Sequence, residues 1–598
     1  MYGTSTHAFT DDDLEREALA ALDVGEGSAL LRRFSSLVRE SGSDDERAAA
    51  EYIVERLRAL GIPVTVYEPE LFLSVPERSE LLVEAGGATR RVDSRPPSFS
   101  LSTGDIPVAG ELVYVPSRYA GGTGSLFDVP AAAEAAAGPD PVAGKIVLTE
   151  GFSMPGPVHA FERRGAIGQI YIHPGPRIHE GICTTIWGAP DASSIERKPR
   201  TPVVCISRPD GERLIGDLGA GPVRADVRTY LREGWMRCAL PVVTIRGSDV
   251  PDEFLLVHGH YDSWYEGIGD NATGNAALLE LARVLHPLAP RLRRSVRIAW
   301  WPGHSTGRYA GSTWYADTFA DEIDEWCLAH LNIDSPGCAG ATAYDEVMWM
   351  AEAGELCTRA IRDAVGTPAR GMRPLRAGDY SFNQIGPTAF FMLLSNIPQE
   401  ERARRGYYAV GGCGGHVAWH TPQDRLDVAD LDVLRADLRV YVTAILRAVN
   451  APLHPFDYAA TIDEIAAAVR QYDAAAAGAV DLQPIVADLE ALRAEYVLWR
   501  AEAEARVLTA PAGERRRANR TLRRLARHLV PLNYARGERF DHDPAVKFGP
   551  VPRLEAAARL AGASDAQRRL LATGLLRERN KVRAVVRAAR RELEAVTR

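Results

Sequence analysis

The residues with the clearest chemical potential are two histidines and two aspartates that follow apolar segments far apart in the chain. They are His260 at the end of FLLVHGH, Asp270 before Asn271, Asp334 after HLNI, and His420 in AWHTPQD. Imidazole and carboxylate groups are the ligands that suit zinc and similar divalent cations. A carboxylate between two such sets can bridge two cations, and paired cations activate a water molecule for attack on a carbonyl carbon.

Each of these residues also has a purely structural interpretation. Taken alone, His260 is interpreted as a hydrogen-bonded histidine at a strand end. Asp270 alone is interpreted as an N-cap, which accepts hydrogen bonds from the free backbone N–H groups of the following helix. Because the four residues are expected at the strand ends of one sheet, their combination favours a metal site over these separate roles.

The segments around these residues predict an α/β fold. Residues 12–60 are expected to be helical, since DDERAAAEYIVERLRALG has apolar residues at helical spacing and stops at Gly61. IPVTVYEPELFL is expected to follow as a strand. From Pro241 onward, apolar strands alternate with helices: VVTIRG, FLLVHGHYD, NAALLELARVLHPL, SVRIAWWPG and HLNIDSPG. Such strands indicate a sheet buried on both faces, with the site beyond their carboxyl ends.

Two other stretches have a different character. Residues 109–235 alternate short β-like runs with Gly- and Pro-rich turns, which predicts a compact, strand-rich insertion. Residues 456–598 are rich in Ala, Leu, Arg and Glu, which predicts a helical domain. Because Glu is interspersed among its arginines, this domain is interpreted as carrying a solvated, salt-bridged face or a dimer surface rather than a nucleic-acid site.

Size and composition limit the function further. A chain of 598 residues is expected to form three or four domains. The net charge of −9 argues against nucleic acid as the main partner, since a phosphate-binding surface needs a basic excess. No run of about eighteen apolar residues predicts a membrane span. Seven cysteines without a C-x-x-C pair, and an N-terminus without signal-peptide character, favour a cytoplasmic protein.

The segment HGHYDSWYEGIGDNATGNAALLELARVL resembles the metal-binding stretch of the M28 family of metallopeptidases, in its glutamate carboxypeptidase and transferrin receptor branch. The resemblance continues through GSTWYAD, NIDSPG and WHTPQD. Within the insertion, GKIVLTEG, RRGAIGQIYIH and TPVVCISRPDGERLI look like a protease-associated (PA) domain. The helical C-terminus is similar in position to the dimerisation domain of that branch.

The resemblance spans nearly the whole chain and implies an order of domains. The expected fold is an M28-type mixed sheet flanked by helices, with a β-rich PA domain inserted and a helical domain at the C-terminus. The implied parts are residues 1–108 and 236–455 for the peptidase domain, 109–235 for the PA-like insertion, and 456–598 for the helical dimerisation-like domain.

The family pattern also implies roles for single residues. His260 and Asp334 would hold one metal ion, Asp270 would bridge to a second ion, and His420 would bind that second ion. Asp262 would lie behind His260 and orient its imidazole ring. The alternative for Asp262 is a strand-end hydrogen bond to the backbone.

One part of the family pattern is missing. The family normally has two consecutive acidic residues shortly before the Gly-Ser of its next helix, the first as general base and the second as a metal ligand. Here the matching positions are His304 and Ser305, and the interval to Gly311 is one residue longer. No carboxylate lies between Trp301 and Tyr315.

Three accounts of His304 follow. It could bind the second metal ion together with Asp270 and His420, which makes a sensible nitrogen-rich set. It could be the general base, because a histidine pKa of about 6.5 suits proton transfer near neutrality. In the third account the second metal is absent, and the protein is catalytically idle or has a changed function.

Further polar residues fall in loops expected around the site. RAGDYSFNQIG places Asp379 and Tyr380 where family members carry residues of the substrate pocket. Arg308 and Arg376 are expected either to clamp a substrate carboxylate or to form structural ion pairs. His416 is expected either as an acid in the pocket or as a surface residue.

The sequence therefore predicts a metal-dependent hydrolase of aminopeptidase, carboxypeptidase or amidohydrolase type. It would cleave an amide, peptide or related C–N bond of a small molecule or short peptide, using a water activated by one or two divalent ions, zinc first. A homodimer through the C-terminal helices is expected. The rival hypotheses are an inactive binding or assembly protein, and an iron or other transition-metal enzyme of a different reaction class on the same scaffold.

Overall fold

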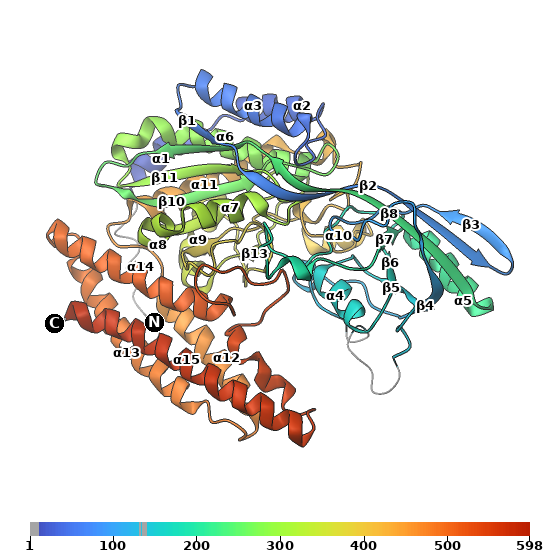
Figure 1. Cartoon of the computed structure of the whole chain (residues 1–598). Helices are drawn as coiled ribbons and strands as arrows, with labels where there is room; N and C mark the ends of the chain where they lie inside the picture. Colours follow the sequence, from blue (N-terminus) through green and yellow to red (C-terminus); the bar gives the residue numbers. More distant parts are fainter. Residues whose placement is uncertain (1–10, 131–132, 134–139, 598) are drawn as a thin grey trace.

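The computed structural model describes residues 11–130, 133 and 140–597. Figure 1 shows a central sheet covered by helices, a second sheet to one side of it, and a group of long C-terminal helices. The long strands β2 and β8 run from the central sheet into the second one, so that the two sheets are joined by a continuous ribbon.

The central sheet has six strands in the order β1-β9-β11-β10-β12-β15. The strand bounds are β1 Val64–Tyr67, β9 Leu240–Ile245, β10 Val250–His260, β11 Arg294–Trp301, β12 Cys327–Asn332 and β15 Thr388–Phe390. Strands β11, β10, β12 and β15 are parallel neighbours, whereas β9 is antiparallel to both β1 and β11. The predicted α/β fold with a mixed sheet is confirmed.

Both faces of this sheet are buried, which explains its continuous apolar strands. In β10, Leu255 and Val257 pack into one hydrophobic cluster, while Phe254 and Leu256 pack into another. The first cluster includes helices α1 Asp12–Ala20, α2 Gly25–Phe34, α3 Asp44–Ala59, α6 Thr273–Leu285, α9 Gly354–Val365 and α11 Leu431–Asn450. The second includes α7 Ala310–Thr318 and α8 Ala320–Trp326. The helix expected to stop at Gly61 ends at Ala59, and Gly61 has a left-handed φ of 72°.

The second sheet has seven strands in the order β3-β2-β8-β4-β5-β6-β7. Its elements are β2 Glu70–Ala85, β3 Ala88–Val92, β4 Val108–Tyr114, β5 Ile146–Glu150, β6 Gly168–Ile172, β7 Val203–Ile206, β8 Val223–Arg237, and helices α4 Pro155–Arg163 and α5 Arg208–Ala220. It has its own hydrophobic core, formed in part by Leu148, Ile170 and Val204. The strand-rich character expected for residues 109–235 is present.

The second sheet begins earlier than the predicted insertion. Strands β2 and β3 belong to it, although residues 1–108 were expected to belong to the peptidase domain. IPVTVYEPELFL, expected as one strand, is divided between the sheets: β1 pairs with β9 in the central sheet, and β2 pairs with β8. Pro69 lies at the break, and a proline has no N–H group to continue the ladder.

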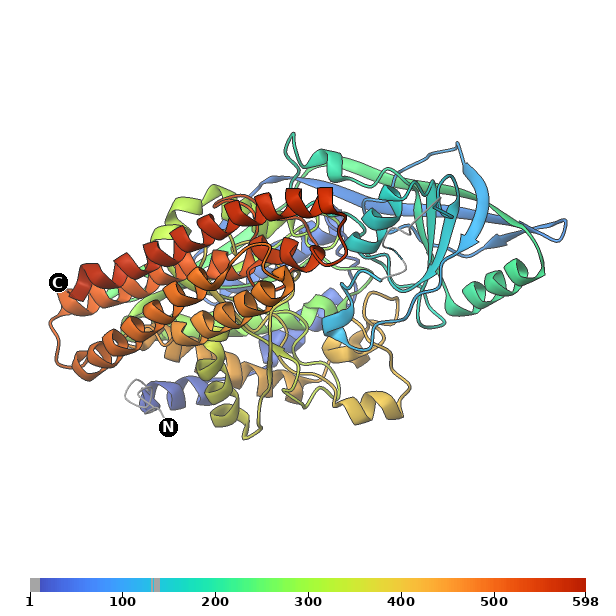
Figure 2. The same cartoon turned by 90° about the horizontal axis from the view of Figure 1, so that it is seen from below.

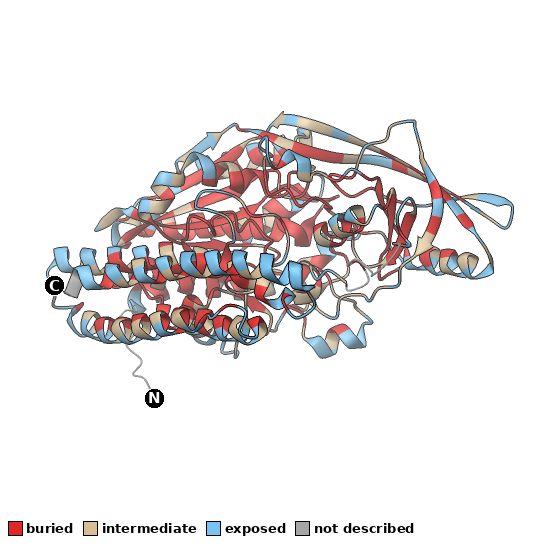
Figure 3. Cartoon of the chain, turned by 60° about the horizontal axis from the view of Figure 1, so that its bottom comes forward, coloured by how far each residue is buried: buried red, intermediate tan, exposed pale blue. Residues whose placement is uncertain are grey.

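The C-terminal residues form four long helices: α12 Tyr458–Ala476, α13 Gln483–Arg506, α14 Ala512–Tyr534 and α15 Asp565–Thr597. Figure 2 shows these helices lying alongside one another. Figure 3 shows the alternation of buried and exposed residues along them, against the buried strands of the central sheet. The helical character expected for residues 456–598 is therefore present.

The remaining short elements are β13 Val347–Met348, β14 Gly371–Met372 and α10 Gln399–Arg404. Among the described residues, no helix combines the length and the apolar character needed to cross a membrane. All seven cysteines are buried free thiols.

Candidate metal centre

Neighbouring parallel strands deliver three of the candidate residues to one edge of the central sheet. His260 is the last residue of β10, and His304 and Asp334 follow shortly after the ends of β11 and β12. Because these strands are hydrogen-bonded in the order β11-β10-β12, their carboxyl ends lie side by side. The position is the one at which α/β sheets carry their sites.

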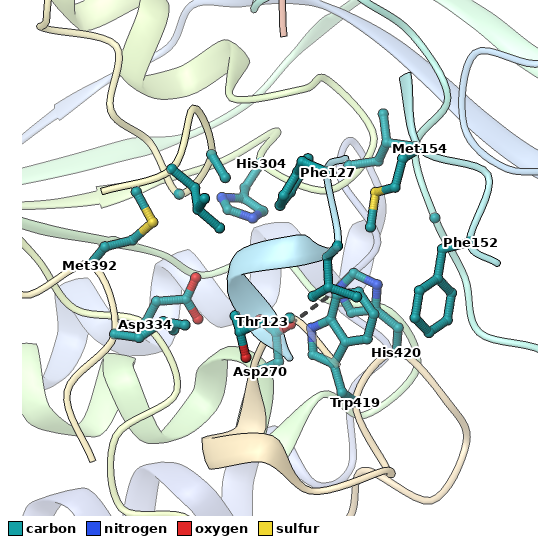
Figure 4. A pocket seen from close by; sticks show the side chains of 18 of the residues that line it. Thr123, Phe127, Phe152, Met154, Asp270, His304, Asp334, Met392, Trp419 and His420 are labelled. Carbon is teal, nitrogen blue, oxygen red and sulfur yellow. Dashed lines mark ion pairs between the residues drawn. The ribbon is translucent and has the colours of Figure 1, made fainter. Parts of the chain in front are cut away.

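Asp270 lies between two histidines. Its Oδ1 is 3.0 Å from Nε2 of His260, and its Oδ2 is 3.1 Å from Nε2 of His420. Figure 4 shows the contact between Asp270 and His420 as a dashed line. Asp334 Oδ1 lies 4.0 Å from His260 Nε2. The structure thus brings together the four residues that the sequence pointed to, with Asp270 in the middle.

The hydrogen bonds of the two histidines orient their Nε2 atoms toward Asp270. His260 Nδ1 lies 3.0 Å from the backbone oxygen of Asp262, and His420 Nδ1 lies 2.9 Å from the backbone oxygen of Glu180. Because a carbonyl oxygen only accepts, each Nδ1 carries a proton and donates, so the second ring nitrogen, Nε2, is the one that faces Asp270 and could bind a metal ion. Anchoring of the outer ring nitrogen in this way is typical of metal-binding histidines.

Two buried atoms of this cluster have no hydrogen-bond partner among the described residues, namely His260 Nε2 and Asp270 Oδ1. Both are acceptors in the neutral-histidine state, so they repel at 3.0 Å unless a proton or a cation lies between them. Burial and the nearby Asp270 charge also raise the pKa of Asp334. A divalent cation would provide a partner for His260 Nε2 and Asp270 Oδ1 and would stabilise the charged form of Asp334. The ligand types suit zinc.

Asp262 supports the cluster from behind. Its Oδ1 lies 3.3 Å from His260 Nδ1, and its Oδ2 accepts hydrogen bonds from Ser305 N at 2.8 Å and from Ser41 Oγ at 2.7 Å. Burial alone would raise the pKa of this carboxyl, but the contact with His260 lowers it to about 2. Asp262 therefore ties the end of β10 to the loop that carries His304, which extends the predicted orienting role.

Asp270 does not cap helix α6, so the structural alternative considered for it is wrong. The N-cap residue of α6 is Ala272, with no side-chain hydrogen bond. The Asp270 carboxylate is left free because Asn271 holds the surrounding backbone: its Nδ2 donates to Ile333 O at 2.9 Å, and its Oδ1 accepts from Ser335 N at 2.9 Å. The role of Asn271 was missed, although its place beside Asp270 in the sequence was a signal.

His304 lies on the His260 side of the cluster. Its ring stacks on that of His260 with centroids 3.8 Å apart and planes inclined by 14°. Ligand atoms of His260, His304 and Asp334 all lie within 4.8 Å of one another. The account that groups His304 with Asp270 and His420 is therefore corrected: the short loop after β11 places it beside the neighbouring strand end of β10.

Asp379 is the partner of His304. Its Oδ2 lies 2.7 Å from His304 Nδ1, and its Oδ1 accepts a hydrogen bond from Ser312 Oγ at 2.6 Å. Because the carboxylate engages Nδ1, the remaining ring nitrogen Nε2 is available to the cluster. Asp379 was expected to line the substrate pocket, but it orients His304 instead.

A mainly apolar cavity includes this cluster in its wall. Figure 4 shows the candidate ligands among its apolar lining side chains. The lining includes Asp270, His304, Asp334 and His420 together with Thr123, Phe127, Phe152, Met154, Glu180, Ile182, Arg308, Leu375, Met392 and Trp419. Loops of the seven-stranded sheet thus form part of the wall. Glu180 and Trp419, which stacks on His420 at 3.7 Å, were not singled out from the sequence.

Besides Asp379, three residues expected at the pocket are not among the residues that line this cavity. Arg376 donates to the backbone oxygens of Tyr380 and Asp543 at 3.1 and 2.8 Å. Tyr380 is fully buried in the core. His416 Nε2 contacts Tyr407 Oη at 3.0 Å, so its alternative as a residue outside the pocket holds. Arg308 does line the cavity.

Comparisons with known proteins agree with this geometry. Residues 242–444 match the sequence model of peptidase family M28. The probable glutamate carboxypeptidase VP8 of Zea mays is 26% identical over 294 residues, which cover 46% of this chain and 40% of the relative. The chain spans less than half the length of the curated relatives it matches.

Two solved structures share the fold. The aminopeptidase from Aneurinibacillus sp. strain AM-1 has a TM-score of 0.53 and 20% identity, covering 73% of this chain and 96% of that protein. BSAP, a zinc aminopeptidase from Bacillus subtilis, has a TM-score of 0.52 and 18% identity, covering 72% and 96%. Because the family match includes the stretch from His260 to His420, we conclude that residues 242–444 form an M28-type peptidase domain.

Proposed function

We propose that this protein is a metal-dependent hydrolase that cleaves an amide, peptide or related C–N bond of a small molecule or short peptide. The observation that carries the proposal is the convergence of the Nε2 atoms of His260 and His420 on the buried Asp270 carboxylate. The family match and the description of BSAP as a zinc aminopeptidase support zinc as the metal. The resemblance of the seven-stranded domain to a PA domain remains a prediction.

The ligand set divides into two positions. His260 and Asp334 with Asp270 would hold one ion, and Asp270 with His420 would hold a second. When bound, a divalent cation at such a site polarises a carbonyl oxygen and lowers the pKa of water. The first position has three protein ligands, which leaves room for substrate or water, as in catalytic zinc sites.

We assign proton transfer to His304. Its Nδ1–H donates to the Asp379 carboxylate, so Nε2 accepts a proton from the attacking water and returns it to the leaving nitrogen. The Asp379 charge stabilises the resulting imidazolium, as a carboxylate does for the histidine of a hydrolytic triad. Asp262 keeps the loop in place through the backbone N–H groups of His304 and Ser305.

The test uses the purified full chain loaded with zinc, assayed for product release from a panel of dipeptides and N-acyl amino acids. We expect turnover that is lost on chelation, restored by zinc, and abolished in Asp270→Asn. The matched control is Asp432→Asn, whose side chain is 92% exposed and does not line the cavity, and which should behave as wild type.

The metal content of the same preparation separates the rival functions. Bound zinc together with hydrolysis supports the proposal. Protein that takes up no metal, even from excess zinc, contradicts it and favours a binding or assembly role. Iron that co-purifies and supports a different reaction would favour the altered chemistry.

A further inference from the structure

We propose that the cavity selects a small apolar substrate that carries a free carboxylate, which Arg308 holds by its guanidinium group. This inference rests on the proposed function, because it places the carboxylate in the same cavity as the scissile bond. Arg308 lines that cavity together with Asp270, His304, Asp334 and His420.

The guanidinium of Arg308 is buried, and two of its three nitrogens have no hydrogen-bond partner among the described residues. The residue is only 4% exposed, and the two nitrogens are Nε and Nη2. Within the described chain, no carboxylate oxygen forms an ion pair with it. Burial lowers the pKa of Arg308, yet an arginine stays charged at neutral pH, so an unpaired cation lies at the cavity wall.

Other buried arginines of this protein donate most of their hydrogen bonds to backbone oxygens. Arg39 donates three hydrogen bonds to the backbone oxygens of Tyr261, Glu266 and Gly267. Arg527 likewise donates three hydrogen bonds to backbone oxygens. Arg527 leaves one guanidinium nitrogen without a partner, whereas Arg308 leaves two and also lines the cavity that holds the cluster. This difference indicates that a ligand supplies the missing acceptors.

The nearby acidic groups are already engaged. Both oxygens of Asp379 are occupied, one by His304 Nδ1 and the other by Ser312 Oγ. Asp270 lies between the imidazoles of His260 and His420. The carboxylates of Asp379 and Asp270 therefore do not pair with the Arg308 guanidinium, which favours an anion supplied by a ligand.

The side chains that line the cavity indicate the character of the rest of the ligand. Phe127, Met154, Ile182, Leu375 and Met392 line the cavity, so the body of the ligand is apolar. The Phe127 and Tyr309 ring centroids lie 5.9 and 4.7 Å from the Arg308 guanidinium carbon and keep water from its flanks. A planar carboxylate can accept two parallel hydrogen bonds from the guanidinium of an arginine. The ammonium group of a lysine cannot form this paired arrangement.

The backbone fixes the direction of Arg308. Arg308 and Tyr309 have left-handed φ values of 48° and 71°, and the Arg308 backbone oxygen accepts a 2.7 Å hydrogen bond from Gly188 in the second domain. Because His304 lies only four residues earlier, the anion site and the assigned proton acceptor belong to one loop. A substrate held at Arg308 is thereby placed beside the cluster.

The experiment measures binding rather than turnover, so that it is independent of the proposed hydrolysis. Isothermal titration calorimetry of the zinc-loaded full chain compares 4-methylpentanoate with its uncharged isostere 4-methylpentanamide. We expect the acid to bind roughly 10- to 100-fold more tightly, the effect of one charge-assisted hydrogen-bonded pair. Arg308→Met should remove this preference, and Arg308→Lys should restore part of it.

Arg118→Met is the matched control, because it removes the same charge from an exposed residue outside the cavity and should keep the full preference. Equal binding of acid and amide by the wild-type chain would overturn the inference. So would an acid preference that persists unchanged in Arg308→Met, since the carboxylate would then bind the metal instead. Absence of hydrolysis with an intact, Arg308-dependent preference would refute only the proposed function.

Discussion

At the level of single residues, the pairing of His304 with Asp379 is the feature on which the proposed mechanism depends. The family resemblance implies two adjacent acidic residues after β11, where the chain has His304 and Ser305, and that replacement remains a prediction. The 2.7 Å contact with Asp379 gives the imidazole a fixed tautomer. In the proposed mechanism, a carboxylate and a histidine from distant loops together do what one acidic residue would do.

Asp379→Asn tests this pairing. The amide removes the charge that stabilises the imidazolium, and we expect kcat to fall about 10²- to 10⁴-fold, the usual contribution of general acid–base catalysis. Zinc content, measured by atomic emission, should stay unchanged. Ser312→Ala is the control, since it removes only the hydroxyl bonded to the other oxygen and should lower kcat by a much smaller factor. Loss of zinc in Asp379→Asn would show that His304 is a metal ligand instead.

The sequence predicted which ligand-type residues lie close together, but not the hydrogen-bond partners that orient them. His260, Asp270, Asp334 and His420 follow recognisable apolar segments, so their meeting could be expected. The ring of His420 donates a hydrogen bond to the backbone oxygen of Glu180, which lies 240 residues earlier in the chain. No periodic pattern in the sequence indicates such a distant contact. Partnerships of this kind depend on how two domains dock, which local patterns do not encode.

At the level of elements, the strands of the central sheet were predictable because burial on both faces leaves continuous apolar runs. FLLVHGH and SVRIAWW lie within β10 and β11 as expected. The division of IPVTVYEPELFL into β1 and β2 was missed, although Pro69 was a signal for a break. The allocation of β2 to the second sheet could not be read locally, because it depends on its distant partner β8.

Strands β10 and β12 contain a buried histidine pair, His258 and His330, whose facing ring nitrogens are 3.0 Å apart. Burial lowers the pKa of His330 to about 3. The unfolded chain therefore binds a proton as pH falls below about 6.5, while the folded chain does not. The contribution of neutral His330 to the free energy of unfolding is therefore complete above about pH 6.5 and declines as the pH falls toward 3.

We expect the free energy of unfolding of the chelated protein to fall between pH 7.5 and 5, by about 2 kcal/mol for one such histidine. Urea titrations at both pH values measure it. In His330→Leu the decrease should be smaller than in wild type, whereas His286→Leu, a half-buried histidine outside the central sheet, should leave it as it was. An identical decrease in His330→Leu would argue against the buried pair as its source.

At the level of the whole molecule, a buried charge cluster joins the helical domain to the central sheet. Glu253 of β10 accepts a 2.7 Å hydrogen bond from Arg294 of β11 and also pairs with Arg523 of α14. His454 Nε2 lies 3.2 Å from the same carboxylate. Removing the negative charge would leave two buried guanidinium groups without their shared partner.

Glu253→Gln should therefore lower the free energy of unfolding by about 3–5 kcal/mol, measured by urea denaturation with a signal from the C-terminal helices. The exposed pair of Arg470 and Glu490 provides the control, because Glu490→Gln should have little effect there. A Glu253→Gln protein as stable as wild type would mean that apolar packing alone holds the helical domain in place.

The C-terminal helices also carry exposed leucines, which fits the homodimer that the family resemblance implies. Leu498 on α13 and Leu570 on α15 are 68% and 75% exposed. We propose that this domain forms the dimer surface, so sedimentation equilibrium should give a dimer for the wild-type chain. The double variant Leu498→Glu and Leu570→Glu should sediment as a monomer; a wild-type chain that is already monomeric would contradict the proposal.

The central claim is that the side chains of His260, Asp270 and Asp334, which meet at the carboxyl ends of β10 and β12, hold a cation. The most direct measurement is diffraction from crystals of the zinc-loaded protein on both sides of the zinc absorption edge. The account predicts an anomalous peak between His260, Asp270 and Asp334, at zinc-ligand distances of about 2.0–2.2 Å. A map with no peak there, or with zinc bound only elsewhere on the molecule, would contradict it.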